Sequence, residues 1–541
     1  MAASRVRVLV ACAALLVALA TAARGAPLSC PVATYDANVD YFPLVGGTRV
    51  FRAHSQNWAI DYFKTYKVLR NTLVNASYVL YLCNTPRPPV DQFPTGTPFF
   101  EIPIGYAGAT SRTHLRFLER LGLRDRLRIV PDVARLTSPC LIQMANNGTL
   151  QSVNANTSYA NVDVVFTQGP ADAGSLNSGA PNKTVITSAF LEDRPLQKLE
   201  WMKFIATFFN AEFTANKEFE QAYFTYQCSS QAAETVATTS GGNGRPIVAW
   251  MSALADDTFI TSDVLYKNRV LQDSGATKLT LSLAAPLAQV QKYLLKADVL
   301  IDDTPTVSSL ADVIAAYQLG SSAAEYKFLK NNRVFKTDLR RNRELSANDF
   351  EDGNFGMPDY LQGDLLNILY TSLNFNWNRI WFRRISAGDA YVLEDASKCP
   401  SSNISSSLAS IYATTICPQT PTGSSVADPS TPPVTDADLP PNTTTTATAA
   451  TVNVASGTSS GGVAGIAIAV LLVGGLVGLT GGYVLGRRVG RHLARQETDA
   501  QAFNMPVVFS SGRGAGEGVA DVPDNRAWTK MRPEDEAGAG A

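Results

Sequence analysis

Few residues in this chain have types and spacings that could support chemistry. The stretch ATSRTHLRFLERLG (109–122) follows an apolar run and places Arg112 and His114 at the start of an expected helix. An arginine there could hold a carboxylate or a phosphate in a forked geometry. His114 is one of three histidines in the chain, and none stands in H-x-x-H or H-E-x-x-H spacing with another. His114 is therefore either a helix-start residue or a ligand contact.

A second candidate is the acidic loop NDFEDG (348–353), whose carboxylates could hold a hard cation, although acidic loops are usually just solvated. No G-x-x-x-x-G-K-[ST] phosphate loop is present. The one G-x-S-x-G string, GTSSG at 457–461, falls in a Ser/Thr-rich stretch rather than on a strand–turn–helix. We therefore predict that the protein is not an enzyme and that it has no metal site and no cofactor.

The two ends of the chain carry membrane-targeting patterns. Residues 1–25 combine Arg5 and Arg7 with an apolar run and small residues, as a secretory signal peptide does. Residues 461–485 are uncharged and long enough to span a bilayer, and arginines follow at once. We expect a single-pass protein of the plasma membrane or another secretory-pathway membrane. Its N-terminal part would face away from the cytosol.

Sequons and cysteines agree with export of the N-terminal part. Six sequons precede the apolar segment, at Asn75, Asn147, Asn156, Asn182, Asn403 and Asn442. Six of the seven cysteines lie between the signal peptide and that segment, so we expect disulfides. We predict a bond between Cys399 and Cys417, while the remaining pairings stay open. The formal net charge of −1 argues against a nucleic-acid partner.

Strand-like and helix-like runs alternate through the body of the chain. Strands are expected at TRVFRA (48–53), ASYVLYLC (76–83) and FFEIPI (99–104), and buried strands in NVDVVFTQG (161–169) and KADVLIDDT (296–304). This alternation predicts α/β layers with largely parallel sheets. Between the two halves, apolar residues recur at helical spacing, which predicts one long helix or two with a short break. The core residues expected on it are Leu199, Met202, Phe204, Ile205, Phe208, Phe209, Phe213 and Phe219.

The predicted fold is therefore α/β, with two Rossmann-like lobes joined by a long helix, followed by a C-terminal transmembrane helix. The expected parts are a signal peptide (1–25), an N-terminal lobe (26–190), a linking helix (191–236), a C-terminal lobe (237–417), a Ser/Thr/Pro-rich stalk (418–460), a transmembrane helix (461–485) and a disordered cytoplasmic tail (486–541).

Six pieces in order resemble the solute-binding proteins of ABC importers, of the class whose lobes are joined by one rigid helix. They include TSRTHLRFLERLGLRDRLRIV, NVDVVFTQG, FLEDRPLQKLEWMKFIATFFN, ADVLIDDT and VFKTDLRRNRELSANDFEDGNFGMPDYLQGDLLNILY, and they cover about Thr48 to Leu373. The iron–siderophore and cobalamin-binding branch is most similar. The bacterial proteins are periplasmic, whereas this chain is expected to carry a stalk and a membrane helix.

The resemblance implies a ligand in a cleft between the lobes, near strand ends and helix starts. It also implies limited lobe closure on the ligand, because a rigid helix restrains hinge motion. The residues expected to face that cleft are Arg112, Thr113, His114, Thr258, Phe259, Arg341, Arg343, Asp349, Phe350 and Glu351.

Two functions follow as alternatives. The first is a cell-surface solute-binding protein that captures a small molecule, such as an iron chelate, for uptake or sensing. The second is a surface glycoprotein that uses the same fold for adhesion or partner binding without a small ligand. Gly474, Gly478, Gly482 and Gly486 recur every four residues, which predicts close helix packing with a second copy or with a multi-pass membrane partner.

Overall fold

The computed structural model describes residues 29–44, 47–170, 176, 180, 182–239, 244–254, 258–261, 265–281, 285–370, 373 and 377–399. The predicted signal peptide, stalk, transmembrane helix and tail lie outside these residues, as do Cys417, Asn403, Asn442 and the four glycines. None of the helices in the described ranges is both long and apolar enough to cross a membrane.

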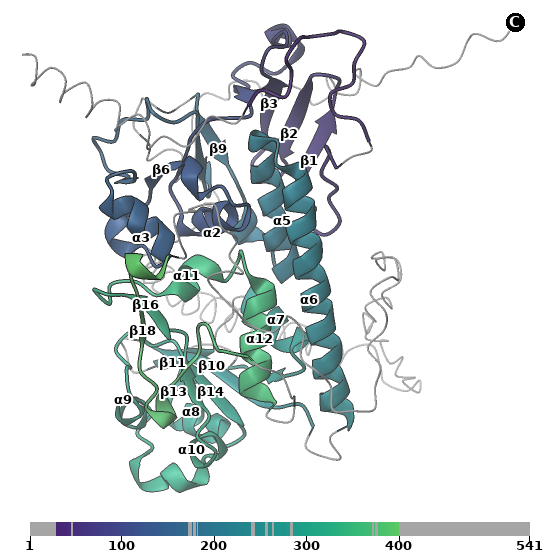
Figure 1. The fold of residues 1–541 in the computed structure, drawn as a ribbon. Helices are drawn as coiled ribbons and strands as arrows, with labels where there is room; N and C mark the ends of the chain where they lie inside the picture. The colour runs from purple at the N-terminus through teal and green to yellow at the C-terminus, as the bar shows by residue number, and fades with distance from the viewer. Residues whose placement is uncertain are drawn as a thin grey trace, which may run out of the picture. The chain divides into compact units, whose positions relative to one another are not determined.

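The first element is a small sheet that the sequence did not separate from the N-terminal lobe. It consists of β1 (Trp58–Tyr62), β2 (Tyr66–Asn71), β3 (Ala76–Leu82) and β4 (Phe99–Ile102), in that order (Figure 1). The first three strands are antiparallel, and β4 is parallel to β3.

The strand predicted at 48–53 is wrong. The chain there curls around a carboxylate instead, because the backbone N–H groups of Ala53, His54 and Ser55 donate to the buried Glu200 at 2.7, 2.8 and 2.7 Å. These donors are engaged by a side chain that lies about 145 residues further along, so a local pattern could not reveal the arrangement.

The first lobe is built on an all-parallel sheet of order β7-β6-β5-β8-β9. Its strands are β5 (Ala107–Ala109), β6 (Leu127–Val130), β7 (Gln151–Ser152), β8 (Val164–Thr167) and β9 (Thr184–Ile186), and its helices are α2 (Arg112–Arg120) and α3 (Pro139–Asn146). All four residues of β8 are buried, as predicted for a strand covered on both faces.

Two helices join the lobes, α5 (Pro195–Ala206) and α6 (Glu212–Thr239). They are separated at Asn210, which adopts the left-handed conformation with φ 52° and ends the first helix. The aromatic residues predicted for the core are buried in this region, with one exception. Phe213 is 66% exposed, so its assignment to the core was wrong.

The second lobe has a mixed sheet whose centre, β10 (Ile247–Ala253), β14 (Val299–Asp302) and β15 (Val334–Lys336), is parallel. The strands around it are β11 (Thr258–Thr261), β12 (Thr277–Lys278), β13 (Ala285–Pro286) and β17 (Arg383–Arg384), and all of them but β12 pair antiparallel. The helices are α7 (Leu265–Asp273), α8 (Leu287–Leu294), α9 (Leu310–Ala316) and α10 (Lys327–Lys330). The expected parallel sheets are therefore confirmed for the first lobe and for the centre of the second.

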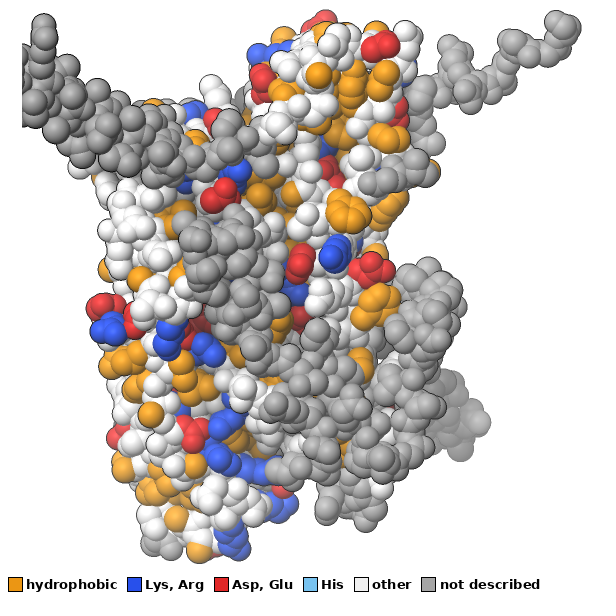
Figure 2. All heavy atoms as spheres, viewed as in Figure 1, with side chains coloured by type: hydrophobic (Ala, Val, Ile, Leu, Met, Phe, Trp, Pro, Cys, Tyr) orange, Lys and Arg blue, Asp and Glu red, His pale blue; other side chains and the backbone are white. Residues whose placement is uncertain are grey.

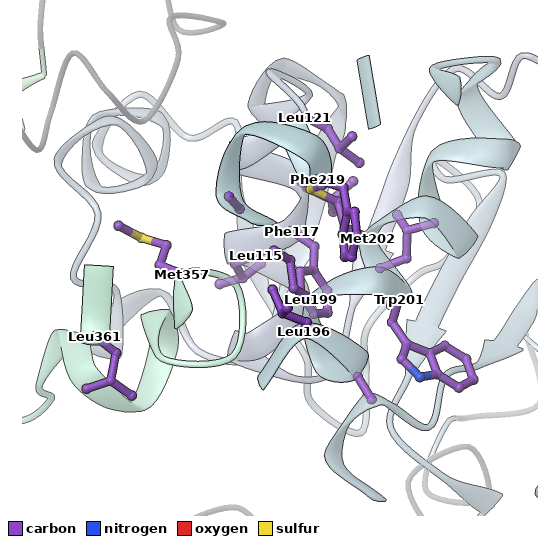
Figure 3. Packing of buried hydrophobic residues seen from close by; sticks show 14 of the residues in the cluster. Leu115, Phe117, Leu121, Leu196, Leu199, Trp201, Met202, Phe219, Met357 and Leu361 are labelled. Atoms are coloured by element: carbon purple, nitrogen blue, oxygen red, sulfur yellow. The ribbon is translucent and has the colours of Figure 1, made fainter. Parts of the chain in front are cut away.

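Helices α11 (Asp349–Gly353) and α12 (Pro358–Leu369) follow the second lobe in sequence but share the core of the first. One cluster of buried residues includes Leu115, Leu199, Phe219, Met357 and Leu361, from α2, α5, α6 and the α12 region (Figure 3). The second lobe has a separate core of its own around Ala249, Leu300 and Tyr317. Because α12 completes the first lobe's core, the two lobes are not independent folding units.

Candidate functional site

Helix α2 carries a row of arginines that are buried in the fold. Ser111 caps its first turn by accepting a hydrogen bond from the Thr113 N–H, and every residue from Arg112 to Arg120 is buried. Arg112, Arg116 and Arg120 are four residues apart and therefore lie on one side of the helix. Such a face is normally solvated. Lys and Arg side chains are common on the visible surface (Figure 2), whereas these three arginines are only 8%, 1% and 6% exposed.

Arg112, predicted to bind the ligand, contacts another predicted ligand residue instead. Its guanidinium forms an ion pair with Glu351 on α11 and lies 3.1 Å from the Asp352 carboxylate. Asp352 also accepts a hydrogen bond from the Thr137 hydroxyl at 2.6 Å. Two carboxylates of the acidic loop that could have held a hard cation are therefore paired with Arg112.

The next two arginines repeat this pattern with greater burial. Arg116 pairs with Asp349 at 2.6 Å, and Asp349 also accepts a hydrogen bond from the Trp381 indole at 3.0 Å. The Thr137 hydroxyl lies 2.7 Å from Asp349 and shares its one hydrogen between this carboxylate and that of Asp352. Arg120 holds Asp359 through two parallel hydrogen bonds of 3.0 Å. Burial alone would raise the pKa of Asp349, but Arg116 and these hydrogen bonds outweigh it and lower the pKa.

We call this set of contacts the inter-lobe latch. It consists of Arg112, Arg116 and Arg120 on α2 with Asp349, Glu351, Asp352 and Asp359. Gly356 lets the two sides meet, since a Cβ at that position would lie 2.6 Å from the Arg116 side chain. Within the described chain, no group of three His, Cys, Asp or Glu side chains could hold a metal ion. The latch is therefore an electrostatic joint between two parts of the chain.

His114 points into the protein. It is 0% exposed, and its Nε2 lies 2.6 Å from the Thr187 hydroxyl. Burial lowers the pKa of His114 to about 3, so the ring is neutral at physiological pH. Thr113 is also buried, near Gln168. In this structure the ring of His114 has no face open to a ligand.

We predict that the burial of neutral His114 lowers the unfolding free energy as the pH falls, whereas the raised pKa of Asp352 has the opposite effect. The unfolded state protonates His114 below about pH 6.5 but the folded state does not, so the unfolding free energy falls by up to about 1.4 kcal/mol per pH unit. Burial, with Asp349, raises the pKa of Asp352 to about 6, so the folded state binds the extra proton and this group stabilises as pH falls from about 6 to 4.

The measurement is urea unfolding between pH 6.5 and 5. His114→Gln should flatten the loss of stability on acidification, and Asp352→Asn should steepen it. Changes of the same sign in both variants would contradict the assignment.

The remaining predicted contacts lie elsewhere. Phe259 packs in the second lobe's core with its ring 4.8 Å from Tyr317, and Thr258 is half-buried at the start of β11. Arg341 donates to the Leu345 carbonyl, and Arg343 is 68% exposed and pairs with Asp395 at 2.9 Å. Phe350 is buried between Trp250 and Trp381. Arg112, Asp349 and Glu351 thus all lie in the latch, where Arg112 pairs with Glu351 and Asp349 pairs with Arg116.

Sequence reasoning missed a band of lysines and aromatic rings, which we call the lysine–aromatic band. Lys267 on α7 pairs with Asp303 at 2.7 Å and lies over the Trp250 ring at 4.6 Å. Asp303 directly follows β14 and also accepts hydrogen bonds from the Trp250 indole at 2.6 Å and from Thr337 at 2.8 Å. Burial would raise the pKa of Asp303, but Lys267 and these donors lower it.

The band continues along α7 towards the first lobe. Tyr266, beside Lys267, stacks edge-on against Phe355 with 5.3 Å between ring centroids. Lys198 on α5 lies over Phe355 at 4.2 Å. Only one part of this band had a signal in the sequence: Asp303 directly follows the strand in KADVLIDDT, and ligands bind at the carboxyl ends of parallel strands. The lysines had none.

The disulfides correct the predicted pairing. Cys399 is bonded to Cys140 on α3, not to Cys417, and a second bond joins Cys30 to Cys83. Cys228 is disulfide-bonded as well. The sequence separation of Cys140 and Cys399 is 259 residues, so proximity along the chain was the wrong guide. The four sequon asparagines in the described ranges, Asn75, Asn147, Asn156 and Asn182, are exposed, and glycosylation stays a prediction.

Comparison with known proteins gives a fold resemblance to solved structures. No protein-family model matches the chain, and no curated protein does. Among solved structures, a possible iron-binding (periplasmic solute-binding) protein from Staphylococcus epidermidis is 14% identical, with 50% of this chain and 99% of that chain covered and a TM-score of 0.37.

Two further structures give similar values. The periplasmic vitamin B12 binding protein of Vibrio cholerae is 13% identical, with 49% of this chain and 97% of that chain covered and a TM-score of 0.32. The petrobactin-binding protein from Bacillus subtilis is 12% identical, with 50% and 93% covered and a TM-score of 0.36. Over about half its length, the chain resembles periplasmic iron–siderophore and vitamin B12 binding proteins in structure.

Proposed function

We propose that this protein is a solute-binding protein that holds a small molecule, such as an iron chelate, beside the lysine–aromatic band. The observation that carries the proposal is the Lys267–Asp303 pair, because both side chains remain 19% exposed at the carboxyl end of a parallel strand. Charged groups beside aromatic rings at such a strand end are typical of ligand sites. Display on the cell surface through residues 461–485 is part of the same proposal.

The lobes are expected to bind this solute without a large closing motion. The inter-lobe latch, the Cys140–Cys399 bond and the core shared by α2, α5, α6 and α12 all join the lobes. Moving the lobes apart would separate the buried arginines from their carboxylates, and each charged group would then have to be solvated alone. This rearrangement is much larger than a hinge motion at one helix. The sequence led us to expect limited closure of the lobes on the ligand. In this proposal the lobes move even less, because these contacts hold them almost rigidly together.

One observation favours the second function, partner binding without a small ligand. The cations expected to grip an anionic ligand, above all Arg112, are neutralised by Glu351 and Asp352. In a protein that no longer binds a small ligand, the cleft residues could form ion pairs with each other, as Arg112 does here. The two functions make different predictions for ligand binding.

Ligand screening separates them. The purified full-length chain is expected to unfold at a higher temperature with at least one member of a panel of ferric siderophores, haem and cobalamin, since ligand at 100 times Kd stabilises by about 2.7 kcal/mol. Lys267→Met should weaken that response at least tenfold. Arg269→Met is the matched control, because Arg269 is on the same helix, 38% exposed and paired with Asp273. If no panel member shifts the wild-type transition, partner binding becomes the better function.

A further inference from the structure

Lys198 is a buried lysine that has no carboxylate partner among the described residues. It lies on α5, is 2% exposed, and donates to the backbone carbonyls of Ala189 at 3.1 Å and Phe190 at 2.8 Å. The rings of Phe355 and Tyr266 lie 4.2 and 5.5 Å from its ammonium nitrogen. Two neutral carbonyls use two of its three N–H groups and leave the third without an acceptor among the described residues.

The charge of Lys198 is not balanced locally. Among the described residues it forms no ion pair. Glu192 and Asp193 act on it from a distance, and the Glu192 carboxylate is already held by Ser55 and by the Trp201 indole at 3.0 Å. Burial lowers the pKa of Lys198 to about 7, although both acids oppose the shift. A buried ammonium in such a place destabilises the empty protein unless an anion arrives.

Its position joins the two lobes. Ala189 and Phe190 belong to the segment before α5, whereas Tyr266 belongs to α7 and Phe355 follows α11. Phe355, whose ring lies over the lysine, and Phe190, whose carbonyl accepts from it, are both half-buried. The ring of Phe190 lies beside Gly169, just after β8, at the carboxyl end of a first-lobe strand.

We propose that the Lys198 ammonium is an anion-binding site at the junction of the lobes, which accepts a carboxylate, phosphate or sulfate group of the bound solute. The third N–H donates to the anion. The negative charge of the anion balances the ammonium, which forms no ion pair among the described residues. A displacement of Phe355, whose ring is partly solvated, opens the path. The inference rests on the proposed function for the existence of a solute, and it adds that the solute is anionic.

The same helix offers a matched control. Lys203 is 5% exposed and also donates to a carbonyl, that of Phe51 at 2.7 Å, but it pairs with Glu200 at 3.2 Å. Lys198→Met removes a buried charge that has no anionic partner among the described residues, so the unfolding midpoint of the empty protein should rise. Lys203→Met leaves Glu200 without its cation, so its midpoint should fall.

Sulfate at 1–10 mM in constant sodium chloride is the probe, and the readout is the thermal midpoint of the full-length chain. Wild-type protein at pH 6.5 should show a saturable rise that Lys203→Met retains and Lys198→Met loses. Sulfate keeps its charge up to pH 9, where only about 1% of a lysine with a pKa of about 7 is protonated. The apparent Kd of the wild type should therefore rise by about 100-fold, a measurement that needs no variant.

Three outcomes overturn the inference: no saturable rise in the wild type, an equal rise in Lys198→Met, or an unchanged Kd at pH 9. A linear rise shared by all variants is the general salting-out effect and counts as the first of these. The ligand panel keeps the two proposals apart. Binding of a neutral solute without sulfate binding removes the anion site only, whereas Lys198-dependent sulfate binding without any panel response removes the proposed solutes only.

Discussion

Replacing Asp349 with asparagine is expected to cost about 3–5 kcal/mol of unfolding free energy. Asp349 is fully buried and accepts hydrogen bonds from Arg116, Thr137 and Trp381. The amide keeps the size of the carboxylate but removes the charge, so the buried Arg116 guanidinium loses its ion pair with α11 and retains the one with Glu119 at 3.1 Å. A buried charge that loses its partner is much more costly than the pair was favourable.

The measurement is urea unfolding of the full-length chain at pH 7. Asp61→Asn is the matched control, because the Arg70–Asp61 pair is a carboxylate–arginine contact with a 54% exposed aspartate, and its loss should cost less than about 1 kcal/mol. Arg116→Met with Asp349→Leu should recover part of the loss. Equal small costs for Asp349→Asn and Asp61→Asn would show that the latch does not join the lobes.

The latch also shows what a sequence can and cannot reveal. The arginine row on α2 is visible as Arg112, Arg116 and Arg120, and the acids are visible in NDFEDG. Both patterns resemble solvated surfaces, and partners such as Arg116 and Asp349 lie 233 residues apart. The sequence identified the residues, but it assigned them to a ligand because nothing local says that two charged surfaces face each other.

Other features were predictable because their cause is local. Strands β8 and β14 are short runs of three apolar residues and one polar residue, and the structure buries both completely. The strand predicted at 48–53 failed because side chains elsewhere take its N–H groups: the Val50 N–H donates to the Tyr62 hydroxyl and the Ala53 N–H to the distant carboxylate of Glu200. Lys198 carries no local signal at all, since only the tertiary fold decides that a lysine on this buried helix has no anionic partner among the described residues.

Removing the Cys140–Cys399 disulfide is expected to have the largest effect of all. In the chain-entropy treatment, a cross-link that closes 259 residues stabilises by about 5.5 kcal/mol, against about 4 kcal/mol for the 53 residues between Cys30 and Cys83. We expect the double alanine variant of Cys140 and Cys399 to lose more stability than that of Cys30 and Cys83. The reverse order would mean that native contacts, rather than loop length, set the effect.

Denaturant slopes distinguish the disulfide from the latch. A cross-link restricts the unfolded chain, so its removal exposes more surface on unfolding and raises the m-value together with the loss of stability. Asp349→Asn acts on the folded state and should lower the midpoint at constant m-value. Since the two changes act on different states, their costs should add when combined. Their sum, about 9 kcal/mol, is comparable to the whole stability of an ordinary domain, so the combined variant should be largely unfolded at 37 °C.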